Sequence, residues 1–223
     1  MKVAQSVRRA ITAVEREPVP LFWGPLKSTD GRPCLPNLSQ WRPGDIVLFS
    51  GNLGKFPDVT AEAITVFQRN RTKLDPTHLA WVHASVYLGD GVCVESLHNG
   101  GPQVILNAMR DRLANSQVRV RRLLRDRAGR RWTAALGRRV AYAALTHLGL
   151  SYPGVFDLPQ GAAAGPAGQR EAVYCSEMCN IAIEMARGPN IASEMGMDPL
   201  PAVMSASTLL TDIQVEWRAA EVS

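Results

Sequence analysis

The chain has 223 residues, of which 46% are hydrophobic and 20% charged, and it carries a net charge of +5. This is enough apolar material to bury the core of one domain, and no apolar run reaches the roughly 20 residues that a membrane-spanning helix requires. Its four cysteines are too few for a dense disulfide framework, so we expect mostly reduced thiols. The composition argues against both a membrane-spanning protein and a small disulfide scaffold.

The N-terminal part of the chain has no feature of a secretory signal. Residues 1–17 lack a compact apolar stretch with a small-residue cleavage site, and their apolar side chains recur at helical spacing instead. We expect an N-terminal helix and an irregular wrapping segment over residues 1–40, and one folded domain with a C-terminal extension over residues 41–223. The protein is expected to be cytoplasmic as made. Delivery outside the cell, or to a target periplasm, would need a secretion system that does not use a cleaved signal.

Five strands are predicted from short apolar or alternating runs bounded by turn residues. They cover residues 46–49, 80–88, 92–97, 103–106 and 117–124. The second and third are joined by Gly89, Asp90 and Gly91, which is a strong signal for a hairpin turn. The middle of the chain is therefore expected to form an antiparallel sheet.

Three longer helices are predicted from apolar periodicity and end signals. They cover residues 58–71, 131–148 and 172–187. The last carries Cys175 in its first turn. Residues 161–168, which read GAAAGPAG, are expected to form a mobile flap over a site. The tail after Gly188 is expected to hold a short helix and a last packed segment.

Three residues stand where plain packing would favour an apolar side chain. Cys175 lies at the start of a helix, where unpaired N–H groups and the helix dipole favour a thiolate. His83 lies within an apolar strand, and Glu95 lies within the next strand, so the hairpin can bring a carboxylate to the imidazole. Each also has an ordinary structural interpretation, as a buried thiol, a paired strand histidine and a water-facing carboxylate.

The remaining histidines have weaker assignments. His78 precedes the His83 strand and is either a substrate contact or a solvated loop residue. His98 follows Glu95 by three residues and is either an alternative orienting group or a substrate contact. His147, near the end of a predicted helix, is expected to complement the helix dipole.

Four segments in this order resemble the circularly permuted branch of the NlpC-type papain-like hydrolases, which includes the YiiX-like proteins and, more distantly, the lecithin:retinol acyltransferase-like enzymes. They are GDIVLF (44–49), WVHASVYLGDG (81–91), VES (94–96) and YCSEM (174–178). The resemblance covers residues 41–187. It implies an α+β, papain-like fold, with an antiparallel β-sheet packed against helices and the histidine strand preceding the cysteine helix.

Carried over residue by residue, the resemblance makes Cys175 the nucleophile, His83 the base and Glu95 the orienting residue. It makes Asp45 a structural residue. Tyr152 matches a family tyrosine and is a candidate substrate-binding residue, although Pro153 follows it where the family has an acidic residue. Tyr174, next to the nucleophile, is a second candidate of this kind.

The expected function is cysteine-dependent hydrolysis of amide bonds, and the resemblance points to peptides of the bacterial cell wall and to a secreted antibacterial effector. An alternative keeps the same Cys-His pair in a lipid or thioester acyl hydrolase or acyltransferase. An alternative of another class is a zinc-binding module in which Cys175 and Cys179 join His83 or Cys93. The hydrolase interpretation requires no cofactor and no metal.

The arginine-rich stretch at residues 110–139 admits two interpretations. It forms solvated faces of one strand and one helix, or it contacts an anionic substrate, polymer or membrane surface. Specific nucleic-acid binding is not favoured, because aromatic residues make up only 6% of the chain and do not interleave with the arginines. The oligomeric state is left open.

Overall fold

The computed structural model describes residues 24, 27–51, 59–97, 101–105, 113–152 and 173–220, with the backbone alone for residues 59 and 101–105. The helix predicted within residues 1–17, the flap predicted at residues 161–168 and His98 lie outside the described residues.

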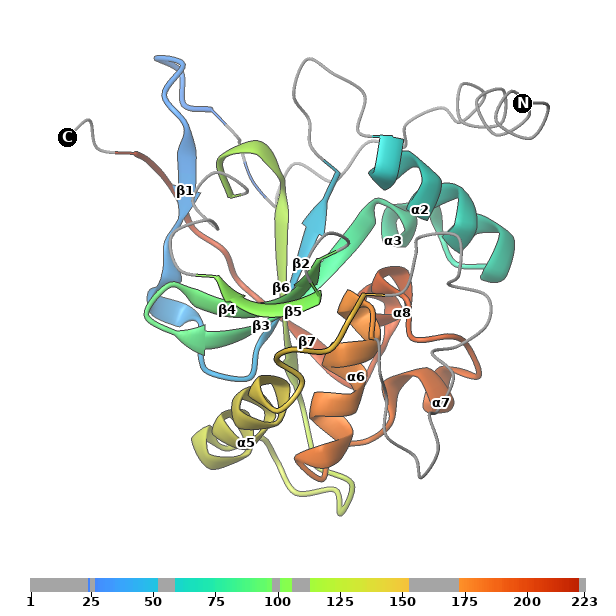
Figure 1. The fold of residues 1–223 in the computed structure, drawn as a ribbon. Helices are drawn as coiled ribbons and strands as arrows, with labels where there is room; N and C mark the ends of the chain where they lie inside the picture. The colour runs from blue at the N-terminus through green and yellow to red at the C-terminus, as the bar shows by residue number, and fades with distance from the viewer. Residues whose placement is uncertain are drawn as a thin grey trace.

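A six-stranded antiparallel sheet forms the centre of the described structure (Figure 1). Its strands are β2 (Ile46–Ser50), β3 (Trp81–Gly89), β4 (Val92–Leu97), β5 (Gly101–Ile105), β6 (Val118–Leu123) and β7 (Leu210–Ile213), in the spatial order β5-β4-β3-β2-β6-β7. The five predicted strands are confirmed as β2 to β6, with ends that differ by a few residues. The sixth, β7, comes from the tail, where only a packed segment was expected.

The β3–β4 hairpin forms as predicted. Asp90 and Gly91 have φ angles of 49° and 77°. A two-residue turn with positive φ at both positions matches the right-handed twist of its flanking strands. Beyond the turn, Ser85 lies opposite Glu95.

Helices pack against one face of the sheet (Figure 1). They are α5 (Ala134–Leu145), α6 (Cys175–Met185) and α8 (Pro201–Ala206), together with α2 (Val59–Arg71), which contacts β3. The short helices α3 (Pro76–Leu79) and α7 (Ile191–Met195) pack against α8. The main core lies between this face and α5, α6 and α8, and it contains Leu48 and Val86 from the sheet with Val140 and Met178 from the helices. The protein is therefore an α+β protein with an antiparallel sheet packed against helices.

The opposite face of the sheet is buried as well. Val47 and Phe49 point into a second cluster with Trp41 and Tyr87, whereas their neighbours Ile46 and Leu48 belong to the main core. Alternate side chains of a strand leave on opposite faces. Burial on both faces therefore explains why β2 reads as an uninterrupted apolar run.

Asp45, which directly precedes β2, is fully buried. Its carboxylate accepts hydrogen bonds of 2.7 Å from Arg122 Nε and Nη2, and one from the Arg42 N–H. Burial raises the pKa of Asp45 against the lowering effect of these donors. These contacts tie the start of β2 to β6 and give Asp45 a structural place in the fold.

The prediction of an irregular wrapping segment up to residue 40 was partly wrong. This segment contains β1 (Cys34–Pro36), which pairs with β8 (Trp217–Ala219) in a separate two-stranded sheet, and a 3₁₀ helix, η2 (Leu38–Gln40). A three-residue strand leaves almost no periodic signal, and its partner lies near the other end of the chain.

The helix predicted over residues 131–148 is shorter than expected. It begins after Thr133, whose hydroxyl accepts from the Leu136 N–H, and it ends at Leu145, before Thr146. None of the described helices combines the length and apolar character that a membrane crossing requires.

Candidate active site

Cys175 is the first residue of α6 and is 3% exposed. Tyr174 before it has extended backbone angles and provides no side-chain cap. The helix therefore begins with N–H groups that its own turns do not use. One of them, the Ser176 N–H, donates a hydrogen bond to the Cys175 sulfur.

The start of α6 is held against the sheet by side chains and backbone groups on either side of it. Ser96 Oγ, on β4, donates to the Val173 carbonyl at 2.6 Å. Ser176 Oγ donates to the Pro199 carbonyl at 2.6 Å. The Val173 N–H also donates to the Ser151 carbonyl at 2.9 Å. This bond holds Ser151, in the segment that follows α5, beside the start of α6.

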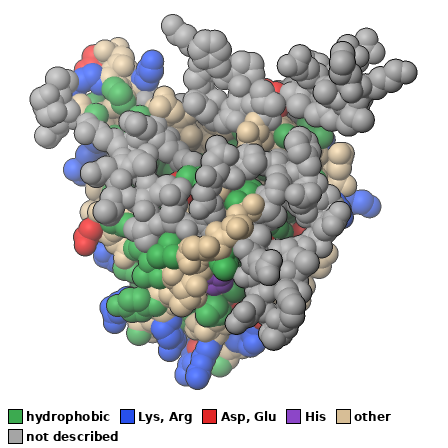
Figure 2. Space-filling view, in the orientation of Figure 1, with side chains coloured by type: hydrophobic (Ala, Val, Ile, Leu, Met, Phe, Trp, Pro, Cys, Tyr) green, Lys and Arg blue, Asp and Glu red, His purple; other side chains and the backbone are tan. Residues whose placement is uncertain are grey.

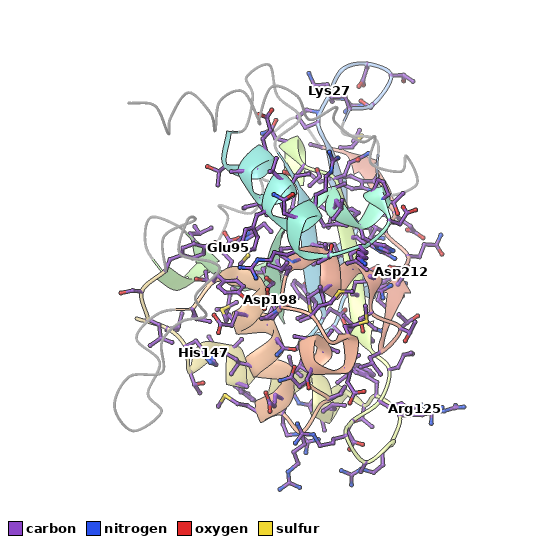
Figure 3. All side chains as sticks on the ribbon, turned by 90° about the vertical axis from the view of Figure 1, so that its right-hand side faces the viewer. Lys27, Glu95, Arg125, His147, Asp198 and Asp212 are labelled. Atoms are coloured by element: carbon purple, nitrogen blue, oxygen red, sulfur yellow. The ribbon has the colours of Figure 1, made fainter. Side chains whose placement is uncertain are left out.

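His83 and Glu95 form a close polar pair on β3 and β4. The distance from His83 Nε2 to Glu95 Oε2 is 2.6 Å. The side chains are 14% and 4% exposed, respectively, so the pair is largely shielded from solvent. Figure 3 shows Glu95 inside the molecule, whereas Arg125 points outward from the other end. A carboxylate at this distance orients the imidazole and favours its protonated form.

The third member of this group is the Cys175 thiol. It shares a hydrogen bond with His83, and it also accepts one from the Ala84 backbone N–H. Because Nε2 is engaged by Glu95, Nδ1 is the ring nitrogen left for the sulfur. The structure therefore brings together Cys175, His83 and Glu95 in one hydrogen-bonded series.

Two opposing effects act on the acidity of Cys175. Burial raises the pKa of the thiol, while the charge of His83, its hydrogen bond and those from Ala84 and Ser176 lower it. The lowering effects prevail, and the pKa lies below its ordinary value. This favours the thiolate, which is the nucleophilic form of cysteine.

Cys179 lies in the same helix and has the opposite character. It is fully buried, and burial raises the pKa of its thiol far above the ordinary value, with smaller contributions from Cys175 and Cys93. All four cysteines of the chain are free. Among them, Cys175 has the environment of a reactive thiol and Cys179 that of an inert core residue.

The two candidate tyrosines lie close to Cys175. Burial raises the pKa of Tyr152, and the charges of Cys175 and Tyr174 raise it further. Tyr174 is 5% exposed and directly precedes the cysteine. The thiol is thus near enough to Tyr152 to affect the acidity of its hydroxyl.

His78 lies in a different cluster. It belongs to α3, and its Nδ1 is 2.9 Å from Ser205 Oγ in α8. Burial lowers the pKa of His78, with a smaller contribution from Arg119, which itself donates to Ser205 Oγ at 2.6 Å. These contacts belong to the packing of α3, α8 and β6.

His147 is buried, and its Nδ1–H donates to the Ala143 carbonyl at 2.9 Å, just beyond the end of α5. This partner is one of the carbonyls that the last turn of a helix leaves free. The contact places His147 at the C-terminal end of α5.

Sequence reasoning missed the groups that position the site. The Ala84 and Ser176 amides are backbone groups and have no residue-type signature. Ser96 could have been predicted from the sequence, because a serine inside an apolar strand next to Glu95 is a buried polar group that needs a partner.

The described part of the chain contains no group of three or more His, Cys, Asp or Glu side chains that could hold a metal ion. Cys175 and His83, in this part of the chain, form a hydrogen-bonded pair. Comparison of the sequence with known protein families gave no match, and a comparison with curated proteins gave none either.

Proposed function

We propose that the protein is a cysteine-dependent hydrolase with Cys175 as nucleophile, His83 as base and Glu95 as the orienting residue. The hydrogen-bonded series of these three side chains, with the thiol at the first position of a helix, carries the proposal. The sheet with its histidine strand, followed by the cysteine helix, is the order of a circularly permuted papain-like fold.

The geometry supports a two-step reaction through a thioester. The Cys175 thiolate attacks a carbonyl carbon, and backbone N–H groups at the start of α6 hold the oxyanion. His83, protonated through Nδ1, gives its proton to the leaving nitrogen or oxygen as the bond breaks. A water molecule then attacks the thioester while His83 accepts one of its protons, and the thiolate leaves again.

For the substrate we propose an amide bond in a peptide of the bacterial cell wall, cleaved by a protein delivered as an antibacterial effector. This rests on the resemblance of residues 41–187 to the permuted NlpC-type hydrolases, because fold and triad alone do not specify a substrate. The second candidate is an acyl ester or thioester of a lipid. It is favoured by exposed apolar side chains, Tyr142 and Leu148, in the segment that leads to Tyr152 beside the thiol.

The first test is labelling with iodoacetamide, a small electrophile suited to a thiol that is 3% exposed. In the folded protein we expect one cysteine to react rapidly well below the usual thiol pKa of about 8.5. The labelled thiol should disappear in Cys175→Ala and react at least about tenfold more slowly in His83→Ala. Cys179→Ala is the matched control and should keep the reactive thiol.

Acyl transfer is tested separately with p-nitrophenyl acetate. A burst of nitrophenol and an acetyl group on the Cys175 peptide, detected by mass spectrometry, would support a thioester intermediate. Digestion of purified peptidoglycan, followed by detection of new amino groups, then tests the amide substrate. If Cys175 reacts no faster than the other buried thiols, the proposed nucleophile is wrong.

A further inference from the structure

Within the described residues, the large hydrophobic side chains that are exposed come from a few neighbouring elements. They are Leu124, Tyr142, Leu148 and Met185, and their exposures run from 41% for Leu148 to 67% for Tyr142. They come from α5, the residues on either side of it and the end of α6. Single exposed leucines are common on protein surfaces, but their restriction to neighbouring elements marks a contact surface.

The same elements carry a concentrated positive charge. Residues 124–148 and 184–187 contain seven arginines and two acidic residues, a net charge of +5 that equals the net charge of the whole chain. The arginines, all exposed, are Arg125, Arg127, Arg130, Arg131, Arg138, Arg139 and Arg187. The two acidic residues, Asp126 and Glu184, pair with Arg130 and Arg127.

Backbone and side-chain contacts join these elements into one surface. The Arg127 N–H donates to the Arg187 carbonyl at 2.8 Å, and the Arg127 side chain is 3.5 Å from Glu184. Helices α5 and α6 pack side by side. Figure 2 shows blue and green side chains next to one another at the lower end of the molecule, where Figure 1 places α5 and the loop before it. We name this surface, formed by residues 124–148 and 184–187, the α5 face.

The α5 face leads to the candidate active site. Leu148, the last residue of its first stretch, lies four positions before Tyr152, whose pKa is affected by the Cys175 thiol. Ser151 accepts the hydrogen bond from Val173 at the start of α6. The end of the α5 face at Leu148 is therefore connected through Ser151 to the start of α6, where Cys175 lies.

We propose that the α5 face docks on a lipid membrane that carries anionic headgroups. The negative surface potential of such a membrane attracts exposed arginines, and aromatic and aliphatic side chains enter the region between headgroups and acyl chains. A dissolved polyanion would use the arginines but would leave Leu124, Tyr142, Leu148 and Met185 without a role. The docking does not depend on whether Cys175 is a nucleophile.

The test is cosedimentation of the full chain with phosphatidylcholine vesicles and with vesicles that contain about one-third phosphatidylglycerol. We expect binding to the anionic vesicles alone and its weakening when salt rises from about 0.1 M to about 0.5 M. Arg138→Gln with Arg139→Gln should weaken binding about thirtyfold, from about fivefold for each arginine. Tyr142→Ser with Leu148→Ser should weaken it about tenfold or more.

The matched control is Arg69→Gln with Lys73→Gln, which removes the same charge from exposed positions in and after α2. It should bind like the wild type, and thermal unfolding would verify that each variant is folded. Equal binding to both kinds of vesicle, or equal losses in the α5-face and control arginine variants, would overturn the proposal. So would an unchanged affinity of the Tyr142 and Leu148 variant together with displacement by dissolved heparin, since this pair of results identifies a polyanion site.

Discussion

Cys175 and Cys179 are one helical turn apart, yet they differ in acidity. Both are buried, and burial alone raises a thiol pKa. Cys175 overcomes this effect because His83 and two backbone N–H groups reach its sulfur, whereas Cys179 has other thiols nearby. The contacts with His83 and with backbone N–H groups of β3 and α6 therefore favour the thiolate at Cys175 and not at Cys179.

The role of Glu95 can be tested by Glu95→Gln. The change keeps the shape of the side chain but removes the charge that stabilises protonated His83 at 2.6 Å. Without that charge the thiolate is less favoured, so the Cys175 pKa rises and the labelling profile moves to higher pH. We expect alkylation by iodoacetamide to slow by about tenfold or more near pH 6 and to recover near pH 9.

Glu194→Gln serves as the control, because Glu194 is an exposed carboxylate in α7. It should leave the profile unchanged. A profile of Glu95→Gln that matches the wild type at every pH would show that Glu95 does not act through His83.

At this scale the sequence identified each of the three residues by its unusual surroundings. A histidine and a glutamate inside apolar strands, and a cysteine at a helix start, are visible one at a time. The hairpin also predicts that His83 and Glu95 are neighbours, but the contact of Cys175 with His83 is not visible, because β3 and α6 are separated by more than eighty residues of chain.

At the scale of elements, a close contact between two glycines seats α5 against the sheet. Gly44 lies in the turn before β2 with φ of +88°, and Gly137 lies in the middle of α5. A Cβ on Gly137 would stand 2.2 Å from the Pro43 carbonyl oxygen, which is backbone and cannot rotate away. Glycine is a poor helix former, but only a residue without a Cβ lets α5 approach the turn this closely.

Gly137→Ala is therefore expected to destabilise the protein although alanine is the better helix former. The gain in helix propensity is about 1 kcal/mol, and we expect overpacking to exceed it, for a net loss of about 2 kcal/mol in the free energy of unfolding. Urea denaturation followed by circular dichroism measures the loss. The reverse change at an exposed site of the same helix, Ala135→Gly, should cost about 1 kcal/mol. A more stable Gly137→Ala protein would contradict the close contact.

A network of charges joins β7 to β6. Asp212 accepts from Arg119 Nε and Nη2 at 2.7 and 2.9 Å, and Arg121 Nη1 lies 3.0 Å from it. Burial raises the pKa of Asp212, but the two arginines outweigh it and hold the pKa below its ordinary value. The carboxylate is thus bound more favourably in its charged form in the folded protein.

Asp212→Asn should lower the free energy of unfolding by about 1 kcal/mol at pH 7, because two buried arginines lose a counter-charge that is 46% exposed and therefore partly screened by solvent. A depressed folded pKa contributes stability above the unfolded value of about 3.9 and loses it as pH falls through the folded pKa. The difference in the free energy of unfolding between wild type and Asp212→Asn should therefore shrink as pH falls below about 4. Urea unfolding at several pH values measures this difference.

The control is Glu216→Gln, which removes an exposed partner of Arg218 and should change the free energy of unfolding by less than about 0.5 kcal/mol. A difference between wild type and Asp212→Asn that stays constant with pH would argue against the ion pairs of Asp212 with Arg119 and Arg121.

At the scale of the whole molecule, stability should be graded from the centre of the large sheet to the small one. Strands β2 and β3 are hydrogen-bonded on both edges, and β2 is buried along its full length. The β1–β8 sheet has two strands of three residues each, with partly exposed side chains. Local opening is easiest where few apolar contacts must break.

Hydrogen exchange followed by mass spectrometry should show this gradient. We expect peptides from β2 and β3 to exchange last and peptides from β1 and β8 to exchange well before them. Equal protection in the two sheets would mean that the small sheet belongs to the same cooperative unit as the core.

The sequence by itself determined most elements of this protein, because strand alternation, helical periodicity and the Asp90-Gly91 turn are local properties. It also indicated which side chains, Cys175, His83 and Glu95, stand where core packing would favour an apolar residue. The tertiary structure alone decided the pairing of β1 with β8, the addition of β7 to the sheet and the meeting of Cys175 with His83. Such contacts join segments far apart in the chain, and they depend on packing and register that no short stretch of residues encodes.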